Sequence, residues 1–313
     1  MHDDYRRSPV RPKLVLALAA LLAAALAGWL ISDAVRGGEG DPKAPGAPTG
    51  TAAGRVAGKP PEGSPANGVT GGAANGRADG PGSLAGKVVV IDPGHNPSNF
   101  QHAREIAELV DIGTNHKECD TTGTSTDDGY PEAAFTRDVS HRLRDLLRER
   151  GATVRLTHDA DRPFGPCVDE RAVIGNQAGA DAVVSVHADG SAVGHRGFHV
   201  ILPALVKGGK ADTTRIVGPS RALGERLARS FGRATGSAPA NYLGGGTGLD
   251  VREDLGGLNL STVPKVFLEC GNMRDPQDAA LLTDPAWRQK AATGIADGIG
   301  AYLLGQDAGT DER

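Results

Sequence analysis

The chain has 313 residues, a formal net charge of −4 at pH 7, and aromatic residues make up only 4% of it. The charge excludes a broad basic surface of the kind that binds nucleic acid. The scarcity of aromatic side chains argues against a platform that stacks single-stranded bases. Composition also changes along the chain, because residues 1–84 and 85–305 differ sharply. The second block is long enough for one domain with a full core.

The first predicted element is an apolar segment. Residues 14–31 read LVLALAALLAAALAGWLI and carry no charge, and four basic residues lie between Arg6 and Lys13. A run of this length predicts a membrane-spanning helix or a long secretory signal. The preceding basic residues predict that the N-terminal stub stays in the cytoplasm and that the rest of the chain is exported. We therefore expect residues 1–36 to contain an anchor or signal, and we favour an uncleaved anchor.

The next segment, residues 37–84, is dominated by Gly, Pro, Ala, Ser and Thr and has almost no large apolar residue. Such a segment cannot offset its ordering entropy by burial, so it predicts a disordered linker. We expect the same of the C-terminal tail, residues 306–313. The folded domain should then span residues 85–305.

Within this domain, apolar patterns of strand and helix type alternate along the chain. Strands are expected at 87–92, 153–157, 181–189, 197–203 and 265–270, and helices at 131–151, 169–180, 216–235 and 284–304. The strands read as apolar on both faces. This pattern predicts a single α/β domain with a mostly parallel or mixed central sheet flanked by helices on both faces.

Between the first strand and the first long helix lies a polar, turn-rich segment, residues 96–130, with one short helix expected near 103–110. Long loops of this kind inside a compact domain are usually functional or mobile. We expect this segment to wall or gate a groove, with Glu105 or Glu108 near the site.

The chain has three cysteines, at positions 119, 167 and 270. Because an exported protein can hold disulfides, we expect Cys119 and Cys167, both in loops, to pair. Cys270 should then remain reduced in a core strand. The alternative is three unpaired thiols.

Chemistry-bearing residues gather where the apolar strands end. The first strand ends at Asp92 and His95, the third reaches His187, and the last reaches Glu269, while Glu132 begins a helix. Ligands of open α/β sheets bind beyond the carboxyl ends of the strands. Two imidazoles and a carboxylate with one open position form the pattern of a catalytic zinc site. The compact helical motif H-E-x-x-H is absent.

Each of these residues also has a simpler interpretation. Glu132 in a first helical turn is favoured by the helix dipole alone. Glu269 follows a buried strand, where an unpaired carboxylate is costly, and a salt bridge to Arg252 or Arg274 would satisfy it. Asp92 either orients an imidazole or bonds the amides of the following turn, and we favour the turn. We assign no metal to five further histidines, namely His116, His141, His158, His195 and His199.

Taken together, four motifs resemble those of the zinc-dependent N-acetylmuramoyl-L-alanine amidases. They read VVVIDPGH, ending at His95; PEAAFTRDVSHRLRDLL, containing Glu132; VVSVHAD, containing His187; and VPKVFLECGNMRDPQDAALL, containing Glu269. Their order and spacing match over about residues 87–304.

The resemblance implies that His95, Glu132 and His187 bind one Zn²⁺ and that Glu269 is the catalytic acid and base. The implied substrate is the amide between the lactyl group of N-acetylmuramic acid and L-alanine in peptidoglycan. We accordingly expect a monomeric enzyme of the bacterial cell wall or periplasmic space, with peptidoglycan as its partner and no nucleic acid.

Two departures from the family pattern concern the groove. NPSN and a long insertion follow His95 in place of a Gly-rich continuation, and Asn272 stands where an aromatic residue is usual. Two other functions remain open. One is a zinc carboxypeptidase or peptidase acting on the stem peptide, and the other is a non-catalytic wall-binding or activator domain.

Overall fold

The computed structural model describes residue 80 and residues 82–305, which form the folded domain. The predictions for the apolar segment 14–31, for the linker as far as residue 79 and for the tail 306–313 lie outside the described residues. No helix among the described residues is long and apolar enough to span a bilayer. Leu84 is fully buried and its amide donates to the carbonyl of Arg150 at 2.8 Å, so the packed domain begins slightly before residue 85.

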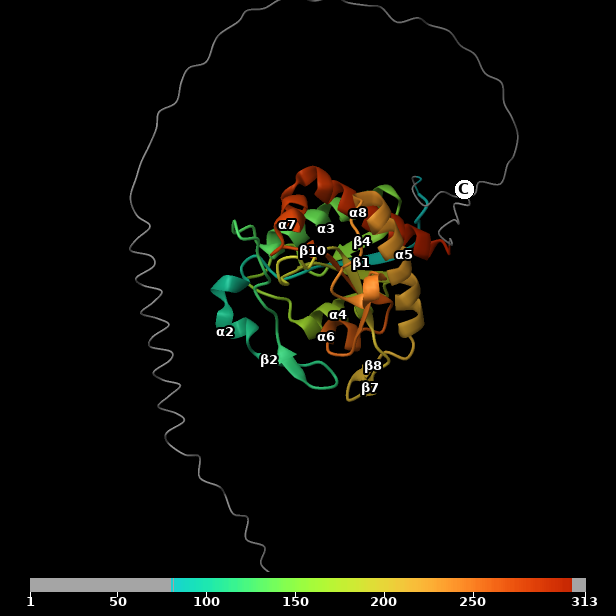
Figure 1. The fold of residues 1–313 in the computed structure, drawn as a ribbon. Helices are drawn as coiled ribbons and strands as arrows, with labels where there is room; N and C mark the ends of the chain where they lie inside the picture. The colour runs from blue at the N-terminus through green and yellow to red at the C-terminus, as the bar shows by residue number, and fades with distance from the viewer. Residues whose placement is uncertain (1–79, 81, 306–313) are drawn as a thin grey trace, which may run out of the picture. The chain divides into compact units, whose positions relative to one another are not determined.

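A six-stranded mixed sheet forms the centre of the domain (Figure 1). Its spatial order is β4 (Thr153–Leu156), β1 (Val88–Pro93), β5 (Ala182–Asp189), β10 (Lys265–Asn272), β6 (His199–Pro203) and β9 (Leu249–Arg252). The first four strands run parallel, β6 is antiparallel to β10, and β9 is parallel to β6. The carboxyl ends of β1, β5 and β10 therefore lie at one edge, and the predicted fold class is confirmed.

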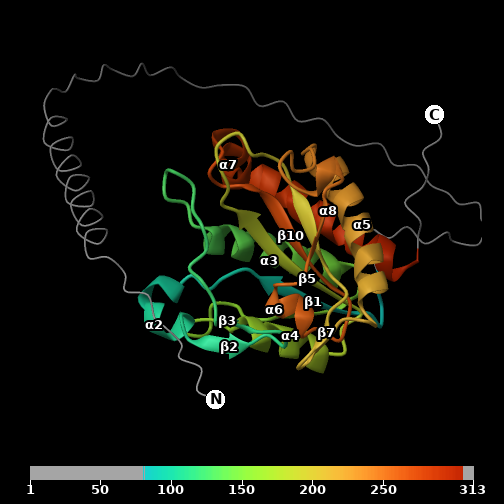
Figure 2. The same cartoon turned by 60° about the horizontal axis from the view of Figure 1, so that its bottom comes forward.

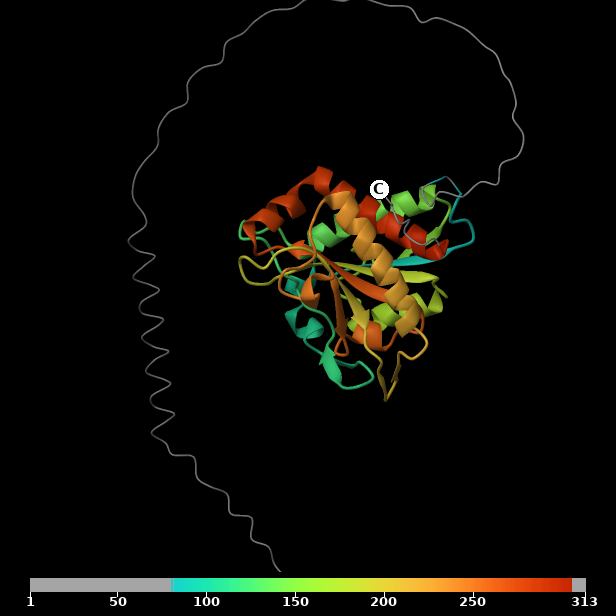
Figure 3. The same cartoon turned by 45° about the vertical axis from the view of Figure 1, so that its right-hand side comes forward.

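Helices cover both faces of the sheet, as predicted (Figures 2 and 3). One face carries α3 (Glu132–Glu149), α5 (Val217–Thr235), α7 (Pro276–Thr283) and α8 (Pro285–Leu303). The other carries the shorter α4 (Val168–Gln177) and α6 (Gly256–Asn259). The expected strands and long helices are all present, with ends shifted by three residues or fewer.

The face under α3, α5 and α8 holds the main hydrophobic core. Because strand side chains alternate between faces, every second residue of β1, β5 and β10 points into this core. These residues are Val89, Ile91, Ala182, Val184, Val186, Ala188, Val266, Leu268 and Cys270. They pack with fully buried helix residues such as Phe135 of α3, Leu227 of α5 and Ile295 of α8.

The opposite face of the same strands is polar where we expected it to be apolar. Asp92 of β1 and Ser185 of β5 are completely buried there, and Lys265 of β10 is 1% exposed. The apolar cluster on this side has only three buried members, Val90, Ala180 and Val183. The near-continuous apolar runs of these strands had suggested that both faces of the sheet are apolar. The second face is buried as well, but its polar residues can be buried because they form hydrogen bonds and ion pairs with one another.

The segment 96–130 contains small elements that the sequence pattern only partly predicts. The expected helix near 103–110 is shorter, α2 (Ala103–Ile106), because the chain then enters β2 (Leu109–Asp111), which pairs with β3 (His116–Glu118). A 3-10 turn, η1 (Asn99–Gln101), precedes α2. Two further elements lie elsewhere, the ribbon β7 (Lys207–Gly208) with β8 (Ala211–Asp212) and the turn η2 (Gly244–Gly246).

The cysteine prediction is confirmed. Cys119 and Cys167 form a disulfide whose Cα atoms lie 4.2 Å apart, and Cys270 is a buried free thiol. The disulfide joins the segment after β3 to the residue that caps α4.

Candidate metal and catalytic site

A tight turn after β1 presents His95. Its backbone has a φ of 60°, a left-handed conformation that few residues other than glycine adopt. Gly94 is required beside it, since a Cβ there would lie 2.4 Å from the ring of His187. The Pro-Gly pair that ends the first strand thus lets two imidazoles approach each other, with ring centroids 5.0 Å apart.

Glu132, the first residue of α3, places its carboxylate between these two rings. One oxygen, Oε2, lies 3.1 Å from His95 Nε2, and the other, Oε1, lies 2.9 Å from His187 Nδ1. The three side chains offer ligand atoms that all lie within 4.8 Å of one another. The structure therefore brings together the three residues that the sequence analysis selected as metal ligands.

The electrostatics of this group favour a positive charge at its centre. Burial alone would lower the pKa of His95, but the carboxylates of Glu132 and Asp120 raise it to about 10. Burial opposes ionisation of Glu132, yet His95 and His187 hold its pKa well below the usual range. The group thus offers two imidazole nitrogens and one negatively charged carboxylate oxygen close together. These are ligand atoms that zinc prefers.

Glu269 lies beside this group on β10, directly opposite His187 in the register of β5. Its Oε2 is buried and accepts no hydrogen bond. Burial, together with the nearby Glu132 and Asp189 carboxylates, raises its pKa well above the usual value. A carboxyl group whose pKa is raised by burial and by neighbouring carboxylates takes up a proton more readily than an exposed one, as a general acid and base must.

The two arginines that we considered as partners of Glu269 pair elsewhere. Arg252 Nε donates to Asp254 Oδ1 at 2.8 Å, and Arg274 NH2 lies 2.8 Å from Asp127 Oδ1. The structure thus gives Glu269 neither of the salt bridges that would have explained it as a structural residue.

His95, Glu132, His187 and Glu269 share one open cavity of about 450 Å³. It adjoins two larger cavities that share lining residues with it. One, of about 540 Å³, extends along the polar sheet face past Phe267 towards β3, and the other, of about 650 Å³, extends past Gly123 towards Phe100. Together they form a groove with the four side chains near its middle.

The segment 96–130 walls this groove, but not through the glutamates that we expected. Thr121, Gly123 and Thr124 line the central cavity. Glu105 instead contacts His102 at 3.2 Å, and the exposed Glu108 lines none of the three cavities. The prediction that Glu105 or Glu108 lies near the site is wrong, because α2 ends early and β2 carries the chain away.

Asp92 takes neither of the roles that we weighed for it. Its carboxylate accepts hydrogen bonds from four side chains: Thr157 at 2.7 Å, Arg171 at 2.8 Å, Ser185 at 2.9 Å and Lys265 at 3.1 Å. Although burial disfavours its charge, Lys265 and Arg171 keep its pKa below the usual range. Asp92 is therefore the centre of a buried ion cluster, and it bonds neither an imidazole nor the turn amides.

Sequence reasoning missed Asp120, which approaches the site from the segment after β3. Its Oδ1 lies 3.4 Å from His95 Nδ1, on the side of the ring away from Glu132. The only local signal was its position next to a cysteine of the predicted disulfide. Its partner Arg171, one turn into α4, carried no signal that distinguished it from a surface arginine.

The five histidines to which we assigned no metal have other surroundings. His116 lies on β3, His141 contacts Asp159, His158 Nε2 donates to the Pro93 carbonyl, and His195 and His199 lie against Tyr242. Asn272, which departs from the family pattern, braces a loop beside the groove. Its side chain donates to the carbonyls of Ala192 and His195 and accepts from the amide of Ser191.

Comparison with known proteins agrees with this geometry. A family model described as N-acetylmuramoyl-L-alanine amidase matches residues 89–301. An N-acetylmuramoyl-L-alanine amidase of Mycobacterium tuberculosis is 40% identical over 231 residues, which cover 72% of this chain and 90% of the relative.

Two crystal structures of amidases named Ami1 resemble the fold. The enzyme of Mycobacterium smegmatis has a TM-score of 0.65 at 40% identity, covering 71% of this chain and 99% of that one. The apo form from Mycobacterium abscessus has a TM-score of 0.64 at 41% identity, covering 70% and 100%. With a family model that spans most of the folded domain, this chain belongs to the N-acetylmuramoyl-L-alanine amidase family.

Proposed function

We propose that this protein is a peptidoglycan hydrolase that cleaves the amide between the lactyl group of N-acetylmuramic acid and L-alanine of the stem peptide. One observation carries the proposal: a carboxylate, Glu132, lies between two imidazoles at 3.1 and 2.9 Å, beside Glu269, whose Oε2 is buried and accepts no hydrogen bond. Family membership supplies the bond type.

The proposed cofactor is one zinc ion held by His95 Nε2, His187 Nδ1 and the Glu132 carboxylate. When bound, zinc supplies Lewis-acid chemistry, which lowers the pKa of water towards about 7 and polarises a carbonyl. Glu269 is the proposed acid and base. It would take a proton from the attacking water and return it to the departing amine of L-alanine.

The groove explains how a branched polymer could reach this site. Cavities of about 650 and 540 Å³ lie on either side of the central one, so sugar and peptide can extend in opposite directions from the scissile amide. We propose that the enzyme works as a monomer outside the cytoplasm, and that the N-terminal apolar segment exports it and anchors it at the membrane.

A zinc carboxypeptidase acting on the stem peptide would use similar groups and cut a different bond. Purified peptidoglycan should be digested with and without a chelator, and the products identified by mass spectrometry. Release of an intact stem peptide with a free L-alanine amine, abolished by the chelator and restored by zinc, is the expected result. Shortened peptides still attached to sugar would overturn the amidase assignment in favour of the carboxypeptidase.

Glu269→Ala should lower turnover by about 10²–10⁴-fold, the usual contribution of a general acid and base, while zinc content stays at one per chain. Glu253→Gln is the matched control, because this exposed glutamate contributes only its backbone carbonyl to a neighbour. Full cleavage by Glu269→Ala would reject the role of Glu269. If instead the native protein itself failed to cleave peptidoglycan, the case for a binding domain would reopen.

A further inference from the structure

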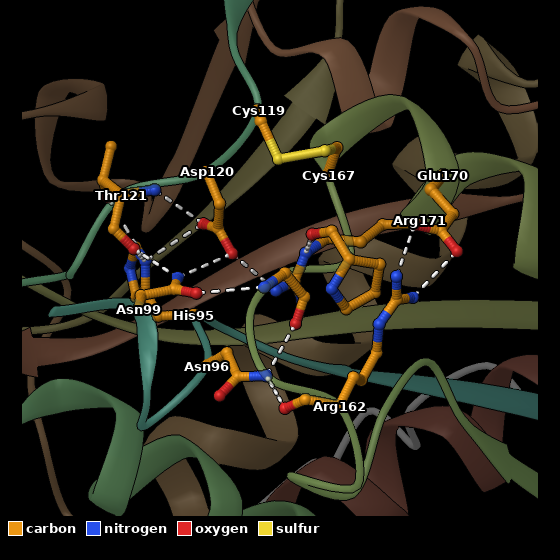
Figure 4. The surroundings of a disulfide bond; sticks show 12 residues. His95, Asn96, Asn99, Cys119, Asp120, Thr121, Arg162, Cys167, Glu170 and Arg171 are labelled. Atoms are coloured by element: carbon orange, nitrogen blue, oxygen red, sulfur yellow. Dashed lines mark hydrogen bonds and ion pairs between the residues drawn. A yellow bond between two sulfur atoms is a disulfide. The ribbon is translucent and has the colours of Figure 1, made fainter. Parts of the chain in front are cut away.

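The imidazole of His95 is held from both sides. Nε2 faces Glu132 at 3.1 Å. Nδ1, on the other side of the ring, lies 3.1 Å from the carbonyl oxygen of Thr121 and 3.4 Å from Asp120 Oδ1 (Figure 4). The carbonyl and the carboxylate can only accept, and the third neighbour of Nδ1, the Thr121 hydroxyl at 3.3 Å, can accept as well as donate. Together they favour a proton on Nδ1. When the ring is neutral, Nε2 is then the nitrogen with the free lone pair, on the side of Glu132 where the zinc ion would bind. A carboxylate or carbonyl in this position fixes the tautomer and ring orientation of a metal-binding histidine.

Asp120 is itself immobilised. It is buried, with 7% of its surface exposed, and its Oδ1 accepts from the Thr121 amide at 2.8 Å. Its Oδ2 accepts from Asn99 Nδ2 at 3.0 Å and from Arg171 NH2 at 2.9 Å. Because both oxygens are engaged, the carboxylate cannot turn away from His95 without breaking these bonds.

Arg171 connects this carboxylate to the strand that carries the histidine. Its NH1 donates to Asp92 Oδ1 at 2.8 Å and to the Pro93 carbonyl at 2.7 Å, two residues before His95. One guanidinium group therefore fixes both the end of β1 and Asp120. Such planar, multidentate contacts are specific to arginine.

The disulfide sets the position of Asp120 relative to Arg171. Cys119 directly precedes Asp120, and Cys167 caps the helix that carries Arg171 one turn later (Figure 4). The Val168 amide also donates to the Cys119 carbonyl at 2.8 Å. Asn99 adds a second link, because its Oδ1 accepts from the Gly165 amide at 3.0 Å while its amide group holds Asp120.

We propose that Asp120 is the positioning residue of His95, and that the Cys119–Cys167 disulfide strengthens zinc binding by holding Asp120 in place. The inference rests on the proposed zinc site. Beyond that site, it makes the zinc affinity of this chain depend on a disulfide whose cysteines are not zinc ligands.

The first test measures the zinc dissociation constant by competition with a chromophoric chelator. Asp120→Asn should weaken zinc binding about 10–100-fold, the typical effect of losing a partner of a metal-bound histidine. Asp128→Asn is the matched control, an exposed aspartate of the same segment outside the three cavities of the groove. Equal affinities of Asp120→Asn and the native protein would overturn the proposal, whereas failure of the native protein to bind zinc would overturn the proposed function instead.

A second readout separates positioning from a general loss of structure. The Co²⁺-loaded protein should show a visible absorption spectrum that shifts in Asp120→Asn and not in Asp128→Asn. If Asp120→Asn does not fold, Asp120→Glu replaces it, because that variant keeps the charge beside Arg171 while displacing the carboxylate from Nδ1. An unshifted spectrum with native affinity in a folded variant would contradict the role of Asp120.

The third test concerns the disulfide. The double variant Cys119→Ser, Cys167→Ser should lose zinc affinity, whereas Cys270→Ser should not, because Cys270 takes no part in the disulfide. Combining the double variant with Asp120→Asn should add little further loss, since both act through one carboxylate. If the fold-losses of the double variant and of Asp120→Asn multiplied in the combined variant, the disulfide would not act through Asp120. Native zinc affinity of the double variant would show that the disulfide has no effect on zinc binding.

Discussion

The two faces of the central sheet are both buried, yet they are built from opposite kinds of residue. Towards α3, α5 and α8, alternate residues of β1, β5 and β10 form a continuous apolar core. Towards α4 and α6, the intervening strand residues Asp92 and Lys265 form an ion cluster with Arg171 of α4. At the carboxyl end of the strands, this second face continues into the candidate site.

The difference between the faces separates stability from function. Apolar burial is non-directional and tolerates small shifts, whereas paired buried charges require fixed geometry and contribute little net stability. The polar face therefore adds less stability than an equally buried apolar face would. It does, however, hold its charged side chains in fixed orientations. Its bonds run from Lys265 through Asp92 and Arg171 to Asp120, which faces His95.

The strongest way to break this comparison is Asp92→Ala. Removing the carboxylate leaves Arg171 and Lys265 buried without their shared partner, which should lower the free energy of unfolding by about 3–5 kcal/mol. Urea unfolding of the zinc-free protein measures this. Because Arg171 also holds Asp120, zinc affinity should fall in the same variant, and native affinity would argue against a connected polar face.

The apolar face offers the complementary variant, Leu227→Ala in α5. This fully buried residue packs in the main core away from the site, so truncation should cost about 2–5 kcal/mol of unfolding free energy. Zinc affinity of the folded variant should be unchanged. A loss of affinity as large as that of Asp92→Ala would mean that the two faces are not functionally distinct.

A smaller effect is expected from pH. The Glu132 and Asp120 carboxylates overcome the effect of burial and raise the pKa of His95 to about 10, so the zinc-free protein holds a proton there at neutral pH. Because a ligand histidine must be neutral, zinc binding should release about one proton. Zinc affinity should then fall about tenfold per pH unit below pH 10, by 1.4 kcal/mol at each step.

The sign of this effect can be checked in two ways. Calorimetry of zinc binding in buffers of different protonation enthalpy should show about one proton passing to the buffer, and buffer-independent heats would contradict the raised pKa. In the zinc-free protein, the same raised pKa stabilises the fold fully below the ordinary histidine pKa of about 6.5. That contribution is lost as pH rises towards 10.

Local pattern predicted the elements of this fold because helix and strand periods appear within short windows. The placing of His95, His187 and Glu269 followed from a similarly simple rule, since parallel strands end at one edge, whereas Glu132 was selected as the first residue of a long helix. The polar face was not predictable in this way. Asp92 and Lys265 are 173 residues apart in sequence, and each read as the flank of an apolar strand.

Asp120 illustrates the same limit. Its role depends on a contact with Arg171, 51 residues away, and on a disulfide that spans 48 residues. No periodicity links these positions. The two-stranded ribbon of β2 and β3 was missed for a related reason, because its strands have only three residues each and β3 carries only polar side chains.

The central claim is that three side chains from β1, α3 and β5 hold one zinc ion beside Glu269. Anomalous diffraction at the zinc absorption edge, from crystals of the zinc-loaded protein, tests it most directly. The account predicts a single strong peak about 2.0–2.2 Å from His95 Nε2, His187 Nδ1 and a Glu132 oxygen. A peak bound by other residues, or none at this position in active protein, would contradict it.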